Sequence, residues 1–257
     1  MNVYFNFEGR VALVTGAGQG IGEAIASQLA ESGAIVYVND VQEKSIHRVT
    51  DKIRAKGHQA YPFRADVTSR NEVFGMVDAI IKQSGAIDFL VNNAGISNPA
   101  QAEEMTEAQF SLVMDVNLKG PFFCSQAAAR YMLPRKYGRI VSMSSVAGLG
   151  GYSGRANYCS SKAGLINLTR VLALEWAKQN VRVNAVAPGI TLTALAMRGY
   201  SKKTQLKVRS QVPMDRLGTV ADIVPPVLFL LSDAAEYITG QTICIDGGMT
   251  AVVMYLH

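Results

Sequence analysis

The fold is decided by the stretch Val11-Ala12-Leu13-Val14-Thr15-Gly16-Ala17-Gly18-Gln19-Gly20-Ile21-Gly22. Its first four residues are apolar and predict a short strand that is buried on both faces. Glycines follow where the chain must turn tightly. Segment 20–32 then repeats apolar residues at helical spacing and ends at Gly33, a typical helix terminator. A strand, a glycine-rich turn and a helix in this order predict the first unit of an α/β fold.

The alternation of strand and helix continues along the chain. Apolar runs predict further strands at 34–39, 59–63, 87–91, 139–143, 181–186 and 242–245. Helical patterns separate them at about 42–56, 69–84, 105–120, 157–179 and 219–231. Repeated β-α units imply a doubly wound parallel sheet with helices on both faces. Since no linker or internal repeat divides the sequence, we expect residues 1–257 to form a single domain.

Composition excludes several classes of protein. With 49% apolar and 18% charged residues, the chain is not expected to be disordered. The net charge of +5 is modest and the basic residues are scattered, so we expect no nucleic-acid partner. Apolar runs such as 227–231 are too short to span a bilayer, and the first residues do not resemble a signal peptide. Three lone cysteines favour a reducing cytoplasm, and the histidines are too scattered to predict a metal site.

The glycine-rich turn predicts a nucleotide site. Glycines let the backbone approach a pyrophosphate, whose charge is favoured at the N-terminus of the following helix. Asp40 ends the second expected strand, and its carboxylate can accept both hydroxyls of an adenosine ribose while repelling a 2′-phosphate. No Arg or Lys stands at Val41, at Gln42 or within the turn. These charges favour NAD over NADP.

A second pattern predicts proton-transfer chemistry. Tyr158 and Lys162 are four residues apart and share one face of the helix expected at 157–179. The ammonium group is expected to lower the pKa of the phenol, which could then exchange a proton with an alcohol near neutral pH. The pair continues the apolar stripe of this helix, so we expect it to face the sheet. Ser144 and Ser145 precede the tyrosine by fourteen and thirteen residues.

Together, these motifs resemble the short-chain dehydrogenase/reductase family over nearly the whole chain. The matching elements, in their order along the sequence, are Thr15-Gly16 with Gly20-Ile21-Gly22, Asp66-Val67, Asn92-Asn93-Ala94-Gly95, Asn117, Ser145, Tyr158 with Lys162, Pro188-Gly189 and Asp246-Gly247-Gly248. One departure is Thr191, where the family usually has an aliphatic residue whose backbone contacts the nicotinamide amide. A backbone contact survives this change.

The resemblance implies a role for each matching residue. Lys162 would hold the nicotinamide ribose and Tyr158 would act as general acid or base. Ser145 would bind the substrate oxygen, with Ser144 the less favoured choice, and Asn117 would hold a water connecting Lys162 to solvent. Besides Tyr158 and Lys162, the implied cofactor-binding residues are Gly16, Gln19, Gly20, Ile21, Gly22, Asp40, Asp66, Val67, Asn93, Ala94, Gly95, Pro188, Gly189, Thr191 and Thr193. The implied architecture is one NAD(P)-binding Rossmann domain with a substrate loop inserted at about 191–217.

We therefore expect a cytoplasmic, NAD-dependent oxidoreductase that interconverts a secondary alcohol and a ketone. The nearest rival is a 3-oxoacyl carrier reductase that uses NADPH, although that subgroup usually has a basic residue at Gln19 and lacks the acid at Asp40. A nucleotide-sensing regulator is a rival of another class, but such relatives typically lose part of the Ser-Tyr-Lys set. The resemblance also implies a homotetramer, in which subunits pair through the helices near 105–130 and 157–179 and through contacts around the last strand. The apolar end at 249–256 is expected to pack on a neighbouring subunit. Candidate pocket residues are Ser97, Met143, Leu149 and Tyr152. The segment near 191–217, expected to be a mobile lid, carries basic residues that include Lys202 and Lys203; a solvated helix face is the favoured explanation of these charges, and an anionic substrate is the alternative.

Overall fold

A single parallel sheet of seven strands forms the centre of the computed structural model, which describes residues 5–193 and 201–251. The strands are β1 (Val11–Val14), β2 (Ile35–Asp40), β3 (Ala60–Arg64), β4 (Phe89–Asn92), β5 (Gly138–Met143), β6 (Val181–Pro188) and β7 (Thr242–Ile245). Their order across the sheet is β3-β2-β1-β4-β5-β6-β7. Because the order reverses between β1 and β4, the loops that leave these strands diverge and open a crevice at their carboxyl ends.

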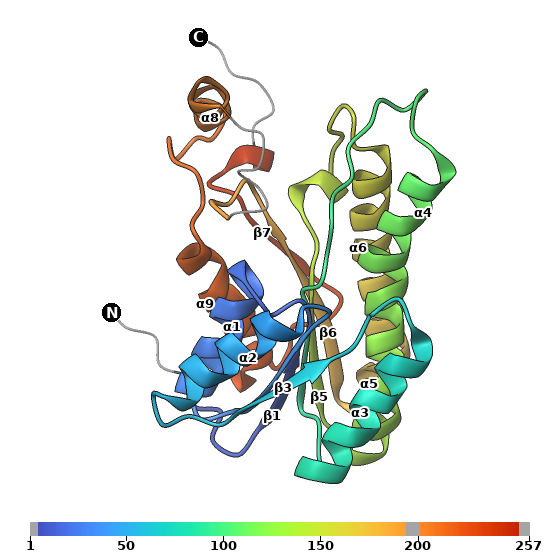
Figure 1. Ribbon diagram of the computed structural model, residues 1–257, viewed down its shortest axis with the longest axis vertical. Coiled ribbons are helices and arrows are strands. Elements are labelled where there is room, and N and C mark those ends of the chain that lie inside the picture. Colours follow the sequence, from blue (N-terminus) through green and yellow to red (C-terminus); the bar gives the residue numbers. More distant parts are fainter. Residues whose placement is uncertain (1–4, 194–200, 252–257) are drawn as a thin grey trace.

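Helices cover both faces of the sheet (Figure 1). One face carries α1 (Gly20–Glu31), α2 (Glu43–Arg54) and α9 (Val220–Leu231), whose apolar residues pack on those of β1 and β2. The other face carries α3 (Arg70–Ser84), α5 (Gly120–Arg135) and α6 (Ala156–Trp176), with α4 (Glu107–Met114) leading into α5. Two separate buried clusters, one on each face, confirm the expected doubly wound fold.

The strands pair in register along their buried lengths. Val11 to Val14 of β1 pair with residues 35–38 of β2, and Ala12 to Val14 pair with residues 89–91 of β4. All four residues of β1 are buried, as the continuous apolar run predicts. The glycine-rich turn that follows β1 is therefore fixed at the centre of the sheet, beside the end of β4.

The sequence placed the strands to within about two residues but misjudged two helical regions. The helix expected at 105–120 is wrong at its end: α4 passes through a π-helical turn at Asp115–Lys119 directly into α5, which continues to Arg135. Gly120-Pro121 suggests a stop, but the proline lies in the first turn of α5, where its missing N–H costs nothing.

A helix in the expected substrate loop was not predicted. This helix, α8 (Lys202–Arg209), begins at Ser201, whose hydroxyl accepts a hydrogen bond from the backbone of Thr204. The loop closes on itself where Thr191 pairs with Gly218 in an isolated bridge. Residues 194–200 of the loop and the apolar end beyond 251, both used in the sequence argument, lie outside the described residues. Within the described chain, no helix has the length and apolar character needed to cross a membrane.

Candidate active site

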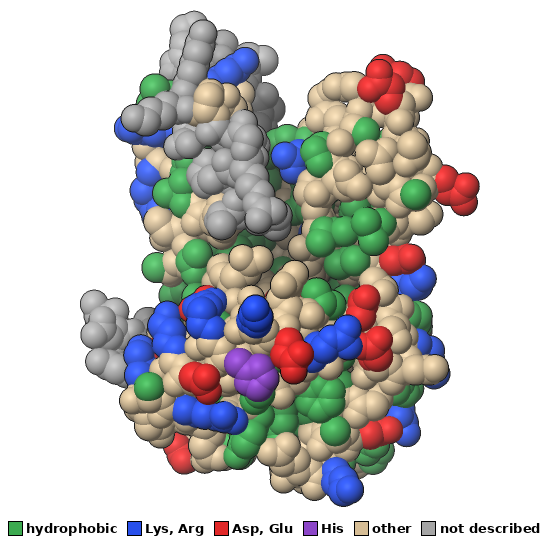
Figure 2. All heavy atoms as spheres, viewed as in Figure 1, with side chains coloured by type: hydrophobic (Ala, Val, Ile, Leu, Met, Phe, Trp, Pro, Cys, Tyr) green, Lys and Arg blue, Asp and Glu red, His purple; other side chains and the backbone are tan. Residues whose placement is uncertain are grey.

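A cavity of about 880 Å³ lies at the carboxyl ends of the strands, between the glycine-rich turn and α6. Figure 2 shows the molecule hollowed between the part that carries α8 and the part that carries α4. The cavity brings together nearly all the site residues that the sequence predicts: Gly16, Gln19, Gly20, Ile21, Asp40, Asp66, Val67, Asn93, Ala94, Gly95, Ser145, Tyr158, Lys162, Pro188, Gly189, Thr191 and Thr193. Gly22 and Asn117 do not line the cavity; they contact residues that do.

The glycine-rich turn has a shape that fits a pyrophosphate. Gly20 is left-handed, with a φ of 62°, and no atom would lie within 4 Å of a Cβ at this position. The space above the turn is therefore open, and the first N–H groups of α1 border it. A helix N-terminus with open backbone in front of it is a suitable site for a phosphate anion. These residues fit the dinucleotide cofactor that the sequence predicts.

The Asn-Asn-Ala-Gly segment holds this turn in place. Asn93 donates from Nδ2 to the carbonyl oxygens of Thr15 and Gly16, at 2.9 Å each. The Thr15 hydroxyl in turn accepts from the backbone N–H groups of Asn93 and Ala94, at 3.1 Å each. Gly22 packs against the same amide, because a Cβ there would collide with Asn93 Nδ2. The absence of a side chain at Gly22 is thus required by packing, and its expected contact with the cofactor stays a prediction.

Asp40 ends β2 and faces the cavity beside the turn. Its Oδ2 accepts from Gly18 N at 3.2 Å and its Oδ1 from Gln42 N at 3.1 Å. Arg48 of α2, which the sequence argument missed, donates from Nη2 to the Gly18 carbonyl at 2.8 Å. Glu23 already pairs with this guanidinium at 2.7 Å, and the hydrogen bond between them lowers the pKa of Glu23. The charge of Arg48 is therefore largely neutralised.

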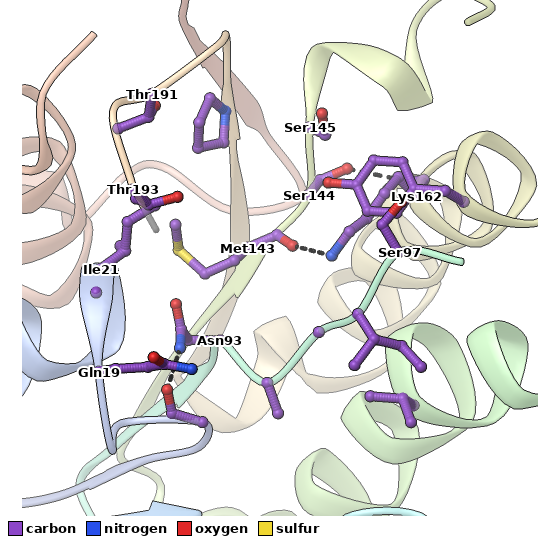
Figure 3. A pocket seen from close by; sticks show the side chains of 18 of the residues that line it. Gln19, Ile21, Asn93, Ser97, Met143, Ser144, Ser145, Lys162, Thr191 and Thr193 are labelled. Atoms are coloured by element: carbon purple, nitrogen blue, oxygen red, sulfur yellow. Dashed lines mark hydrogen bonds between the residues drawn. The ribbon is translucent and has the colours of Figure 1, made fainter. Parts of the chain in front are cut away.

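Tyr158, Lys162 and Ser145 meet at the other end of the cavity. Both Tyr158 and Lys162 project from the first turns of α6, and Ser145 follows β5. Lys162 is 4% exposed and donates from Nζ to the Met143 carbonyl at 2.7 Å (Figure 3). The Ser144 hydroxyl donates to the Lys162 carbonyl at 3.0 Å. This bond fixes α6 to β5 and leaves Ser145 as the serine that can bind a substrate.

The expectation of a lowered tyrosine pKa is wrong for this structure. Burial raises the pKa of Tyr158 above its ordinary value, and a hydrogen bond with Ser145 and the charge of Arg155 oppose this only in part. Lys162 does not provide the expected effect because its ammonium group is bound to the Met143 carbonyl, 5.6 Å from the ring centre. Burial also lowers the pKa of Lys162, to about 8. Tyr158 therefore carries its proton at neutral pH, which suits a general acid.

Asn117 lies behind the cavity, in the π-helical turn between α4 and α5. It is completely buried and binds both backbone groups of Ile96: Oδ1 accepts from N at 2.8 Å, and Nδ2 donates to O at 2.9 Å. A Cβ on Gly95 would be 3.3 Å from Asn117 Oδ1 and 3.5 Å from Lys162 Nζ. Asn117 therefore positions the loop that separates it from Lys162. Its expected role in holding a water remains a prediction.

The segment after β6 forms the opposite wall. Gly189 donates to the Ile245 carbonyl at 2.9 Å, and a Cβ at this glycine would be 2.9 Å from Asp246 Cα. Thr191 is buried, and its hydroxyl donates to the Gly189 carbonyl at 3.2 Å. Thr191 and Thr193 line the cavity on the same side of the view as Ile21 and Gln19, away from Ser145 and Lys162 (Figure 3). Of the other candidate pocket residues, Ser97, Met143 and Tyr152 line the cavity, whereas Leu149 does not.

Arg155 is the lining residue that the sequence argument missed at the catalytic end. It is the N-cap residue of α6, three positions before Tyr158, and this spacing alone does not show that it lines the cavity. Metal chemistry has no comparable support: in the described part of the chain, no three His, Cys, Asp or Glu side chains are grouped as metal ligands would be.

Comparisons with known proteins agree with this geometry. A family model described as enoyl-(acyl carrier protein) reductase matches residues 16–250. The 3-oxoacyl-[acyl-carrier-protein] reductase of Staphylococcus aureus strain Mu50 is 44% identical over 93% of this chain and 97% of its own. The enzyme of the same name from Thermotoga maritima is 38% identical over 94% of this chain and 98% of its own.

A solved structure of gluconate 5-dehydrogenase from Burkholderia cenocepacia J2315, in complex with NADP and tartrate, has a TM-score of 0.93. It is 34% identical and the match covers 97% of this chain and 98% of that one. The fold, the cavity and these relatives lead to one conclusion: the chain belongs to the short-chain dehydrogenase/reductase family and is an oxidoreductase that uses a nicotinamide cofactor and acts on CH–OH groups.

Proposed function

We propose that this enzyme interconverts a secondary alcohol and a ketone, with NAD as its cofactor and Tyr158 as its general acid or base. The observation that carries the proposal is the meeting of Tyr158, Ser145 and Lys162 at one end of a cavity whose other end is a glycine-rich phosphate cradle. A protonated phenol and a serine hydroxyl beside a nicotinamide site are the groups that carbonyl reduction requires.

The chain's own residues supply orientation and the proton. When bound, the nicotinamide supplies or accepts a hydride at the carbon atom of the substrate. In the direction of reduction, Ser145 binds the carbonyl oxygen and Tyr158 gives its phenolic proton to that oxygen as negative charge develops on it. In the oxidation of an alcohol, the same phenol must first be deprotonated. Lys162 would hold the nicotinamide ribose through its ammonium group, which has further N–H donors besides the one bound to the Met143 carbonyl.

NAD is favoured by the charges around Asp40. A 2′-phosphate on the adenosine ribose would approach the carboxylate of Asp40, and Arg48, which contacts the glycine-rich turn, is already paired with Glu23. NADP is named in the Burkholderia complex described above, and that cofactor is the alternative for this chain.

A second candidate is the reduction of a 3-oxoacyl group on a carrier protein, because two of the relatives described above bear that name. It is the same chemistry at the same site, with a larger substrate. The two candidates differ in cofactor preference and in whether a carrier thioester is reduced faster than a small ketone. The complete Ser-Tyr-Lys set argues against a non-catalytic regulator.

We further propose a cytoplasmic homotetramer whose subunits each form one domain. Exposed apolar side chains on α4, α5 and α6 support the assembly: Phe110, Leu112, Phe122, Val171 and Leu174. Leu174, in the last turn of α6, is 82% exposed, which leaves a large apolar side chain in contact with water unless a neighbouring subunit covers it. These are the helices through which the family resemblance predicts that subunits pair.

The proposal is tested by replacing Tyr158 with Phe. The variant keeps the ring but loses the proton, so we expect single-turnover reduction to slow by about 10²-fold or more while NADH still binds. A panel of ketones and alcohols assayed by NADH absorbance, with NADH and NADPH in parallel, provides the substrates. A variant that keeps more than about a hundredth of the wild-type rate would exclude Tyr158 as the proton donor.

A further inference from the structure

Arg155 is a cation in the catalytic half of the cavity with no acidic partner. Its guanidinium lines the cavity together with Ser97, Tyr152 and Tyr158. Among the residues that the structure describes, no carboxylate lies within ion-pair distance of it. The acids among the described lining residues, Asp40 and Asp66, follow β2 and β3 at the other end of the sheet. The positive charge of Arg155 is therefore uncompensated where the substrate must bind.

The position of Arg155 is unfavourable for the helix that it begins. It is the N-cap residue of α6, and its side chain makes no capping hydrogen bond. Ser, Thr, Asp and Asn are the residues that stabilise this position, and a cation is disfavoured at the positive end of a helix. A residue that opposes the local structure without compensation is typical of a functional site.

The arginine is also not needed to hold the neighbouring loop. Its Nη1 donates to Ser97 Oγ at 3.1 Å, but Asn157 already ties the same loop to α6, through a hydrogen bond from Nδ2 to the Asn98 carbonyl at 2.9 Å. Ala100 N adds a bond to the Gly154 carbonyl at 3.0 Å. Two contacts besides that of Arg155 thus anchor the loop.

The contact with Ser97 prepares two donors for one ligand. Because the Ser97 oxygen accepts from the guanidinium, its own hydrogen is free to point into the cavity. The guanidinium keeps its remaining N–H donors in a planar fork that matches the two oxygens of a carboxylate. The other cation that lines this end, Lys162, is bound to the Met143 carbonyl and is assigned to the cofactor.

We propose that Arg155 and Ser97 bind a carboxylate of the substrate, so that the enzyme acts on an oxo acid or hydroxy acid. This inference rests on the proposed function of the site. Arg155 and Tyr158 line the same end of the cavity, and the charge of Arg155 acts on the Tyr158 phenol. The carboxylate held by Arg155 is therefore close to the carbon whose oxygen Tyr158 protonates.

The cations of α8 are weaker candidates for the same role. The guanidinium of Arg209 is paired with Asp215 at 2.6 Å, and Lys207 is exposed and does not line the cavity. The side chains of Lys202 and Lys203, on which the sequence argument placed an anionic substrate, lie outside the described residues. The cation that we assign to an anionic substrate is therefore Arg155 at the start of α6, and not a lysine of the lid.

Paired substrates test the proposal kinetically. Acetoacetate and 4-oxopentanoate are each compared with their methyl esters in the wild type, Arg155→Gln, Arg155→Lys and Lys207→Gln. We expect the wild type to reduce the acids with a kcat/KM at least about tenfold above that of the esters. In Arg155→Gln, the loss for an acid should exceed the loss for its ester by about ten- to a hundredfold, mainly through KM, because a charge-assisted pair is removed.

The control variants separate this role from others. Arg155→Lys keeps the charge without the fork and should recover part of the preference for acids. Lys207→Gln removes one positive charge outside the cavity and should leave the preference unchanged. Equal losses for acid and ester in Arg155→Gln would show that the arginine only supports the structure, and this would overturn the proposal.

A binding measurement judges the inference even if no compound is reduced. Oxo acids and their esters are titrated calorimetrically into the protein saturated with NAD⁺, in which a ketone cannot accept a hydride. Tighter binding of the acids that is lost in Arg155→Gln supports the carboxylate site, and equal binding of acids and esters refutes it. Absence of turnover for every ketone with either reduced cofactor would count against the proposed function instead.

Discussion

Replacing Asp40 with Asn should move the cofactor preference from NADH toward NADPH. The carboxylate is partly buried beside the turn, and a 2′-phosphate would carry about 1.5 negative charges at a distance of about 5 Å. With an effective dielectric constant of about 40, the repulsion is about 2.5 kcal/mol, which corresponds to a factor of about 60. The ratio of kcat/KM for NADH to that for NADPH should therefore fall by about ten- to a hundredfold.

Asp51→Asn is the matched control, because it makes the same charge change on α2 at an exposed residue that does not line the cavity. Asp40→Asn also loses one of the two backbone hydrogen bonds to Gly18 and Gln42, so its thermal midpoint is measured in parallel. A wild type that already prefers NADPH, or a ratio that does not change in Asp40→Asn, would refute the reasoning.

Glu23 provides a second step in the same experiment. Its carboxylate holds Arg48, whose Nη2 lies 2.8 Å from the Gly18 carbonyl. In the double variant with Asp40→Asn, Glu23→Gln should release this guanidinium toward a 2′-phosphate and lower the ratio further. Glu23→Gln alone should have a smaller effect, because Asp40 still repels the phosphate.

Three further predictions concern stability and assembly. Burial lowers the pKa of Lys162 from 10.5 to about 8, so between these pH values the unfolded protein binds more protons at this residue than the folded protein does. The free energy of unfolding should therefore rise by about 1.5 kcal/mol from pH 8 to pH 9.5. Urea titrations of Lys162→Met should lack this rise. Gly16→Ala should destabilise the protein by about 2 kcal/mol or more, because φ is 61° and a Cβ would lie 2.6 Å from Ala94 Cα. Gly75→Ala, in the open interior of α3, should stabilise it by up to about 1 kcal/mol; a similar change in thermal midpoint for both variants would contradict this account. Light scattering of the wild type should give the mass of a tetramer, and Leu174→Glu should give a smaller species if α6 is buried between subunits.

Much of the fold was predictable because apolar runs and glycines report local structure directly. Val11–Val14 is buried throughout, as its sequence indicates, and Asp40 ends β2 as predicted. The π-helical turn before Gly120 was not predictable, since its cause is tertiary: the wider turn places Asn117 against Ile96. Helical continuity through a Gly-Pro pair is likewise decided by packing against the sheet.

The candidate site was predictable as a set of residues but not as a set of interactions. Motif spacing placed Tyr158 and Lys162 on one face of α6, and the structure brings them to the same cavity. Whether the pKa of Tyr158 is raised or lowered depends on its burial and on where the ammonium group of Lys162 is bound. The spacing of the two residues in the sequence predicts neither of these. Arg155 and Arg48 were missed for a similar reason, because their importance lies in the partners that their charges have or lack.

The side-chain amide of Asn117 imitates a neighbouring strand. It offers Ile96 one acceptor and one donor, as a peptide group does within a sheet ladder, at a point just beyond the end of β4. The backbone at Ile96 is thereby attached to the junction of α4 and α5 instead of to β1 or β5. Amide hydrogen exchange at Ile96 should therefore follow the opening of those helices, and not the much slower opening of the central strands.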